Sequence, residues 1–346
     1  MIRFIYSFIM LFMALTFVSC QSYRTVNIEM YKPASITFPP EVRTIMIIDN
    51  TVRQPDNFGH HLLGVQNQDS TVPVSTDSMS YYFCLSLGKA IAESPLFDDV
   101  RLCDDTFRRD SLFYLTRPFA IGDVKRLCDE YDVDAIVTLD KLIFNTLLYN
   151  RESNNTYGFD FLVTGIDGEM KAFWRGQNVL FSIPFTDSLT WTFDTYGPNE
   201  TITTRDMEYG IRYLSENTGQ KMYIHFVPFW LSDERWYYTS VISDWKRATA
   251  YAVAEKWESA ANIWLPLFST TTQKKRKAHL ASNLALTQEM KGNFLKAIEY
   301  AEIAASLYKE IADGDNKFRK MQQDYLELLQ KRLEDESKLS EQLREN

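Results

Sequence analysis

The chain has 346 residues, and its 46 acidic and 37 basic side chains give it a net charge of −9 at pH 7. This acidic balance argues against a nucleic-acid partner and against a polybasic membrane-binding surface. The length, with 45% hydrophobic residues, predicts two domains with ordinary buried cores.

The first twenty residues have the layout of a secretory signal. One basic residue, Arg3, precedes an apolar stretch from Phe4 to Val18, and Ser19-Cys20 follows. The stretch is shorter than the about 20 apolar residues of a permanent transmembrane anchor. A plain secreted protein would need a small-x-small cleavage site, and the segment offers only a poor one.

Ser19-Cys20 resembles a bacterial lipobox, in which a cysteine receives fatty acyl chains such as palmitate. The resemblance implies removal of residues 1–19 and lipidation of Cys20. Because one acyl chain anchors weakly, stable attachment needs several chains. No acidic cluster follows Cys20, so we expect an outer-membrane protein that faces the periplasm. The polar, proline-marked residues 20–42 are expected to form a tether.

Residues 43–225 predict an α/β domain. The hydrophobic patterns predict strands at 43–49, 99–103 and 133–148, and helices at 77–94 and 121–131. Strand and helix alternate, which is typical of helices packed on a sheet. The order resembles the small α/β domain of the curli secretion lipoprotein and the amino-terminal domain of the Tol-system propeller protein. That resemblance implies no catalytic residue.

The loop from residue 51 to 75 is long and polar for a compact domain, so we expect it to be functional or disordered. It contains His60-His61. Two adjacent histidines without a nearby third ligand favour a solvated loop over a metal site.

Residues 159–193 alternate between apolar and polar positions in four short runs, which predicts an antiparallel meander. Asp167-Gly168 and Gly176-Gln177 are expected to supply turns. A helix should follow, from Thr203 or Thr204 to about Tyr223.

Three cysteines, Cys84, Cys103 and Cys128, remain after Cys20. An odd number cannot form a complete disulfide framework. We expect three buried, unreactive thiols, and the alternative is one disulfide with one free thiol.

Residues 226–240 are densely aromatic and are expected to form a linker packed between the two halves of the chain. The alternative is a ligand site in which aromatic rings stack on a sugar. Its candidate residues are Trp230, Trp236, Tyr237 and Tyr238.

Residues 241–312 predict two helical hairpins. The second, with Asn283-Leu284-Ala285, Gly292 at the turn and small residues at Ala297 and Ala301, resembles a tetratricopeptide repeat. The first hairpin resembles it less, since Glu255 replaces the turn glycine. Residues 313–346 should form a capping helix with a charged, fraying tail, or else a coiled-coil contact.

These features together predict an α+β protein, with an N-terminal α/β domain and antiparallel meander followed by an all-α tetratricopeptide-like helical-hairpin domain. They resemble a family of uncharacterised Bacteroidota lipoproteins with a C-terminal tetratricopeptide-like region. That family has no established activity, so the resemblance implies a compartment and an architecture only.

The sequence lacks G-x-S-x-G, HExxH, G-x-G-x-x-G and P-loop patterns. We therefore assign no catalytic, cofactor-binding or metal-binding residue. We expect a membrane-anchored, non-enzymatic envelope protein whose helical repeats bind a protein or peptide partner, with Asn283 as a candidate groove residue. One alternative is a ligand-binding (for example glycan-binding) lipoprotein that uses segment 226–238 or loop 51–75. The other is an enzyme with an unrecognised site.

Overall fold

The computed structural model describes residues 23–63, 69–151, 158–176, 181–195, 203–311 and 316–343. The chain divides into two compact units. Of the described residues, the sheet unit is built mainly from 33–229, and the helical unit from 23–32 together with 230–339. The predicted α+β class is confirmed, because a β-rich region with antiparallel strands precedes an all-helical region. Cys20 and the predicted signal segment 1–19 lie outside the described residues.

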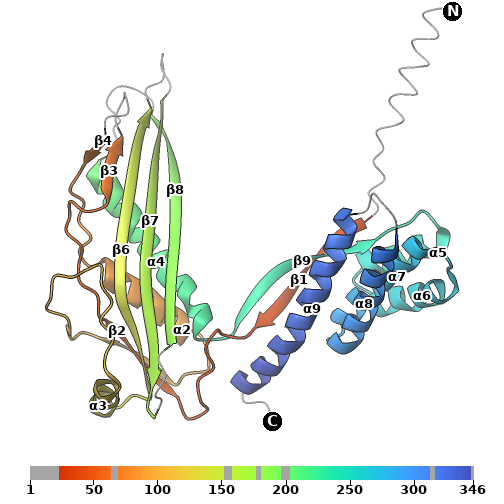
Figure 1. Ribbon diagram of the computed structural model, residues 1–346, viewed down its shortest axis with the longest axis horizontal. Coiled ribbons are helices and arrows are strands. Elements are labelled where there is room, and N and C mark those ends of the chain that lie inside the picture. Colours follow the sequence, from red (N-terminus) through yellow and green to blue (C-terminus); the bar gives the residue numbers. More distant parts are fainter. Residues whose placement is uncertain are drawn as a thin grey trace, which may run out of the picture. The chain divides into compact units, whose positions relative to one another are not determined.

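The sheet unit is organised around a seven-stranded sheet (Figure 1). Its strands are β2 (Thr44–Asp49), β3 (His60–Leu63), β4 (Asp69–Thr71), β5 (Asp99–Cys103), β6 (Ala135–Arg151), β7 (Gly158–Trp174) and β8 (Phe181–Thr195). Strand β2 pairs in parallel with the edge strand β5 on one side and with β6 on the other. Strands β6, β7 and β8 form the antiparallel meander.

Helices cover both faces of this sheet. They are α2 (Met79–Ala92), α3 (Ile121–Tyr131) and α4 (Thr204–Lys221), and a short 3-10 turn, η1 (Met222–His225), follows α4. The larger core lies under α2 and α4, and a smaller one lies under α3. Helices α2 and α4 approach closely because Gly219 has no side chain: a Cβ there would lie 2.4 Å from the Phe83 carbonyl oxygen.

The meander has longer strands than predicted. Asp167-Gly168 is not a turn but lies within β7, paired with β6 and β8. A Cβ on Gly168 would lie 2.2 Å from the ring of Phe185, so this glycine makes room for a cross-strand aromatic ring. Gly176, with φ of +84°, does lie in a turn as predicted, whereas Gln177 is outside the described residues.

The described cysteines form no disulfide. Cys84 and Cys128 are fully buried, whereas Cys103 is only partly buried. Burial raises the pKa of the Cys84 thiol and raises the pKa of Cys128 to about 11. Since the thiolate is the reactive form, both buried thiols should be unreactive.

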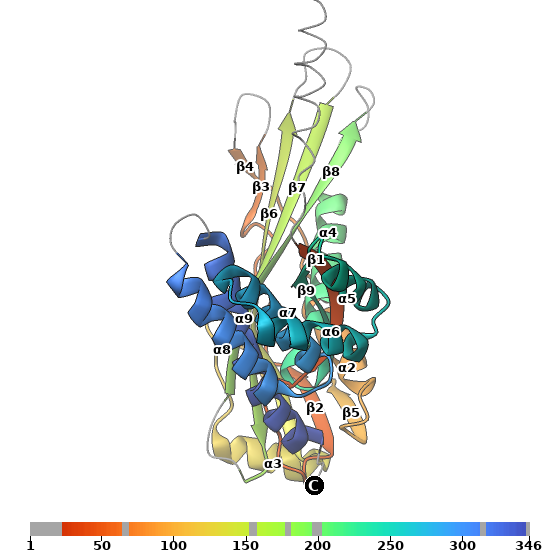
Figure 2. The same ribbon diagram turned by 90° about the vertical axis from the view of Figure 1, so that its right-hand side faces the viewer.

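The helical unit contains α5 (Ser243–Val253), α6 (Trp257–Thr270), α7 (Lys274–Glu289), α8 (Phe294–Glu310) and α9 (Asn316–Leu343), with a two-stranded sheet of β1 (Tyr23–Lys32) and β9 (Phe229–Tyr238). The four helices of the two predicted hairpins are present. Helices α5 to α8 stack in chain order, each against the next (Figure 2). Gly292, with φ of +72°, lies in the connection between α7 and α8.

Three predicted boundaries in this unit are wrong. Residues 23–32 of the predicted tether form β1, and most of the predicted linker forms β9. Each strand finds its hydrogen-bonding partner about 200 positions away in the sequence, which no local pattern reveals. The predicted fraying tail is also helical, since α9 continues to Leu343. Beyond the apolar residues of α9, Asp335 forms a 2.8 Å ion pair with Lys32 of β1 and so ties the C-terminal part of the helix to that strand.

Candidate functional site

One cavity of the sheet unit lies at the carboxyl end of β2. Helix α2 leads from β2 to β5 on one side, and α3 leads to β6 on the other. Ligands of open α/β sheets bind where the connections diverge in this way, outside the carboxyl ends of the strands. Here a cavity of ≈ 200 Å³ occupies that position.

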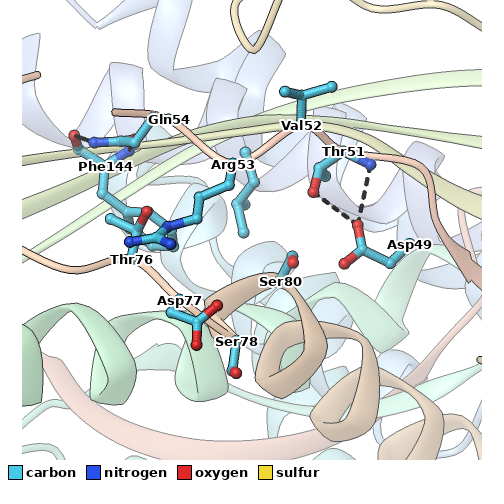
Figure 3. Close-up of a pocket in the computed structure, with 11 residues that line it drawn as sticks. Asp49, Thr51, Val52, Arg53, Gln54, Thr76, Asp77, Ser78, Ser80 and Phe144 are labelled. Atoms are coloured by element: carbon cyan, nitrogen blue, oxygen red, sulfur yellow. Dashed lines mark hydrogen bonds between the residues drawn. The ribbon is translucent and has the colours of Figure 1, made fainter. Parts of the chain in front are cut away.

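Three segments line this cavity, which we call the β2 cleft (Figure 3). The end of β2 and the residues after it form one side, the start of α2 forms another, and β6 contributes two apolar side chains. The lining residues are Asp49, Thr51, Val52, Arg53, Gln54, Thr76, Asp77, Ser78, Ser80, Leu142 and Phe144. Part of the predicted functional loop, residues 51–54, therefore borders the cleft.

Gln54 and His60 fix the segment after β2. The buried Gln54 amide bonds both the backbone N–H and the carbonyl of Phe144, at 2.7 and 3.0 Å. Gln54 also lies 3.1 Å from Nε2 of His60, whose Nδ1 lies 2.9 Å from the Thr146 hydroxyl. Burial lowers the pKa of His60 to about 4, so its ring is neutral at pH 7.

The predicted location of the two histidines in a loop is therefore wrong, since both lie on β3. His60 faces the core, where its ring nitrogens are satisfied, and His61 pairs with Asp69. Among the residues that the structure describes, no group of three or more His, Cys, Asp or Glu side chains is placed to hold a metal ion.

The start of α2 is unusual in two ways. Ser78, the residue before its first turn, has a left-handed backbone (φ of +62°) and no capping side-chain hydrogen bond. Non-glycine residues in this region are strained, and such strain collects at functional sites. Thr76 is 6% exposed, and its hydroxyl has no hydrogen-bond partner. A buried hydroxyl without a partner is costly unless a ligand supplies one.

The cleft offers both hydrogen-bond donors and acceptors. The first turn of α2 presents backbone N–H groups and the positive end of the helix dipole. Asp49 and Asp77 present carboxylates, and one oxygen of Asp49 accepts hydrogen bonds from the backbone and hydroxyl of Thr51. Arg53 is paired with Asp56. Because the cleft presents both donors and acceptors, it suits a polar ligand that both donates and accepts hydrogen bonds.

A buried ion cluster lies beyond the cleft, on the α3 side of the sheet. Lys171 on β7 lies 2.9 Å from the fully buried Asp140 of β6 and 2.8 Å from Glu169. Burial lowers the pKa of Lys171, but its hydrogen bonds to the two carboxylates outweigh this and raise it overall. The amide of Asn50, next to the cleft, donates to Asp140 at 2.7 Å. The cluster is internally paired and supports the carboxyl end of β2.

Asn283, the candidate groove residue, is fully buried. Its side-chain amide donates to the carbonyl of Tyr238 and accepts from the N–H of Tyr238, at 2.8 and 2.6 Å. The prediction that Asn283 contacts a partner is therefore wrong. Asn283 does hold an extended backbone, but that backbone is strand β9 of the same chain.

The four candidate aromatic side chains do not form one platform. Trp230 is 67% exposed, whereas Tyr237 and Tyr238 are buried in the core of the helical unit. Trp236 is partly buried against Tyr325 of α9. The stacking hypothesis for these four residues is therefore wrong, because alternate residues of β9 point to opposite sides and most of them pack onto helices.

The helical unit also contains a buried ionic centre that no sequence pattern predicted. Glu289 of α7 is bonded by Arg235 of β9 at 3.1 Å and by Tyr325 and Arg332 of α9. Burial, with a smaller contribution from the Glu289 carboxylate, raises the pKa of Tyr325 far above its usual value. No sequence spacing links these residues, because they come from three separate elements.

Two family models match the chain. One, described as a domain of unknown function (DUF8603), matches residues 42–238, and another, described as a domain of unknown function (DUF6340), matches residues 246–331. A comparison with curated proteins gives no match.

Solved structures give only distant likenesses. A minor lipoprotein of Acinetobacter baumannii is 10% identical with a TM-score of 0.24, and the match covers 55% of this chain and 97% of that protein. A Xanthomonas campestris protein of family model DUF330 is 8% identical with a TM-score of 0.23, covering 56% of this chain and 91% of that protein. A hypothetical protein of Chlamydia trachomatis is 9% identical with a TM-score of 0.23, covering 52% and 93%.

Within the described part of the chain, no helix is long and apolar enough to cross a membrane. The DUF8603 match covers more than half of the 346 residues and contains every residue of the β2 cleft. The chain therefore belongs to the DUF8603 family.

Proposed function

We propose that this protein is a lipid-anchored, non-enzymatic binding module of the cell envelope, held by Cys20 on the periplasmic face of the outer membrane. The lipobox-like Ser19-Cys20 supports the anchor. The β2 cleft is the proposed binding site.

The observation that carries the binding site is the unpartnered, buried hydroxyl of Thr76 beside an uncapped helix start. A ligand that both donates and accepts hydrogen bonds would satisfy these groups and the Asp49 and Asp77 carboxylates together. A small saccharide has this chemistry. The cavity of ≈ 200 Å³ is below the roughly 300–1,000 Å³ of drug-sized sites, which favours one or two sugar rings.

Calorimetric titration of the mature chain with a panel of mono- and disaccharides tests this proposal. Thr76→Val removes the hydroxyl while nearly preserving side-chain shape, and Thr106→Val is the matched control on an exposed threonine of the same unit. We expect loss of one hydrogen bond to weaken binding by about 3- to 12-fold in the Thr76 variant only. No binding by any sugar, or equal binding by both variants, would contradict the proposal.

A second candidate function is binding of a protein partner by the helical unit. One cavity of ≈ 360 Å³ lies between β1, α7, α8 and α9 and presents the exposed carboxylates of Glu29 and Glu255. It would take a lysine or arginine side chain of a partner. Crosslinking pull-downs from native envelopes test this site. The double variant Glu29→Gln/Glu255→Gln should fail to capture a protein that the control variant Glu302→Gln still captures. Capture of the same proteins by both variants would argue against the site.

A further inference from the structure

The two-stranded sheet of the helical unit has an open edge along β1. Strand β1 pairs with β9 on one side, and among the described residues no strand lies on its other side. The ring centroids of Tyr31, near the end of β1, and Trp230, near the start of β9, are 4.9 Å apart. Tyr23 and Tyr238, at the other ends of the two strands, both contact Phe318. The strands are therefore antiparallel, and alternate residues of β1 direct both their N–H and their carbonyl away from β9.

A cavity of ≈ 360 Å³, which we call the β1 cavity, borders this edge. It touches the consecutive residues Val26, Asn27, Ile28 and Glu29. Successive side chains of a strand point to opposite faces, so contact with a run of residues indicates that the cavity meets the backbone edge. Within the described ranges, the backbone of these residues forms no hydrogen bond apart from its pairing with β9. The edge therefore offers main-chain donors and acceptors to a ligand.

The β1 cavity carries a negative charge. Its charged lining side chains are Glu29, Glu255, Glu289 and Arg332. Arg332 is ion-paired with Glu289, so the charges of these two cancel. Glu29 and Glu255 are exposed, and neither forms an ion pair with any other residue that the structure describes. The lining also includes residues that directly follow α5 and α7, where the C-terminal ends of the helix dipoles add negative potential.

Glu255 has a backbone conformation that glycine adopts more easily. Its φ of +57° lies in the left-handed region, and it is the second residue after α5, a position at which glycine commonly ends a helix. Strain of this kind collects at functional sites. The Glu255 carboxylate is therefore placed beside the cavity at some cost to the fold.

We propose that the β1 cavity binds an extended peptide segment of a partner protein, which adds a strand to the edge of β1 and directs a lysine or arginine side chain to Glu29 and Glu255. The inference rests on the proposed partner binding by the helical unit and specifies its mode. Main-chain hydrogen bonds would supply affinity, and the basic side chain would supply specificity. A single turn of helix, about 10 Å across, fills about 420 Å³, so the cavity suits an extended segment better than a helix.

An array of immobilised heptapeptides tests the charge preference of the purified protein. The central residue is arginine, glutamine or glutamate, and the flanking positions vary among valine, threonine, isoleucine and tyrosine, which favour extended strands. We expect the protein to bind arginine-centred peptides and not their glutamate-centred counterparts. Equal binding to the two sets, or no binding to either, would overturn the proposal.

Charge-matched variants locate the binding site of the best arginine-centred peptide by fluorescence anisotropy. Glu29→Gln/Glu255→Gln should weaken binding by about 5- to 30-fold, because two ion pairs are lost. Glu299→Gln/Glu302→Gln removes two exposed charges of α8 outside the cavity, and we expect less than a twofold change. Equal losses in the two double variants would overturn the proposal.

Replacing Glu255 with glycine separates binding from folding. Glu255→Gly removes the carboxylate together with the strain, so it should bind the peptide more weakly and yet unfold at no lower temperature than the wild type. Unchanged affinity would overturn the assignment of Glu255 to the site.

Two measurements test whether the peptide adds a strand. Hydrogen exchange at residues 26–29 should slow when the peptide binds. Methylating the peptide amides on one edge should weaken binding at least about 10-fold, whereas methylating those on the other edge should have little effect. Binding that needs arginine and both glutamates but leaves exchange in β1 unchanged would overturn strand addition and leave the proposed partner site standing. Absence of arginine-dependent binding would count against both.

Discussion

Replacing Thr76 with valine should stabilise the ligand-free protein, which is the opposite of what most core substitutions do. The Thr76 hydroxyl is buried without a partner, and such a group costs about 1–3 kcal/mol relative to a partnered or apolar one. Valine has almost the same shape, so it removes this cost without creating a cavity.

The expected gain is about 1–2 kcal/mol in the free energy of unfolding of the sheet unit, which spans about 200 residues. For a domain of this size, that gain raises Tm by roughly 2–8 °C. Calorimetry would measure the shift, and hydrogen-exchange mass spectrometry would assign the transition to the sheet unit. Thr106→Val should shift it by less than about 0.5 kcal/mol, as exposed substitutions usually do. A loss of stability in Thr76→Val would show that the hydroxyl already has a partner and would remove the main argument for the cleft.

Three further predictions test interactions inside the two units, at His60, Asn283 and Gly219. Burial lowers the pKa of His60 to about 4, so the folded state binds fewer protons than the unfolded state between pH 6.5 and 4. Lowering the pH through this window should therefore destabilise the sheet unit progressively, by up to about 3 kcal/mol. Urea titrations at pH 7 and pH 4.5 measure this loss, and a His60→Gln variant with the same pH dependence would refute its assignment to His60. Asn283→Ala leaves the N–H and carbonyl of Tyr238 without their side-chain partner. We expect the free energy of unfolding of the helical unit to fall by about 2–4 kcal/mol in urea titrations. An unchanged unfolding midpoint would show that these two hydrogen bonds do not stabilise the unit. Gly219→Ala should cost about 1–3 kcal/mol, because the new methyl group meets the Phe83 backbone, and Gly122→Ala, where nothing lies within 4 Å, is its control in thermal unfolding.

The sequence predicted most of the regular elements because their signals are local. The apolar run before Asp49 and the helical stripes of α2 and α3 each lie within one short window, and each matches an element of the structure. The helices of the C-terminal half were predicted for the same reason. Gly176 and Gly292 marked turns correctly, since both have a positive φ.

The wrong predictions share a nonlocal cause. Residues 23–32 were predicted to form a tether, because the strand that pairs with them lies far away in the sequence, at Phe229–Tyr238. Gly168 read as a turn because Phe185, the ring that requires a glycine there, lies on the next strand. Asn283 was predicted to line a partner-binding groove, because its true partner, the backbone of β9, is distant in the sequence. In each case, tertiary pairing decided the role of a residue whose own neighbourhood in the sequence was ambiguous.

The binding surfaces illustrate the same limit. Loop 51–75 was a candidate for length and polarity alone, and only folding brings its first residues against Thr76 and the start of α2.

Intact-mass spectrometry of the protein purified from native membranes tests the proposed lipid anchor. We expect a chain that begins at Cys20 and carries the added mass of several fatty acyl chains. A chain that retains residues 1–19, begins elsewhere, or carries an unmodified Cys20 would contradict it.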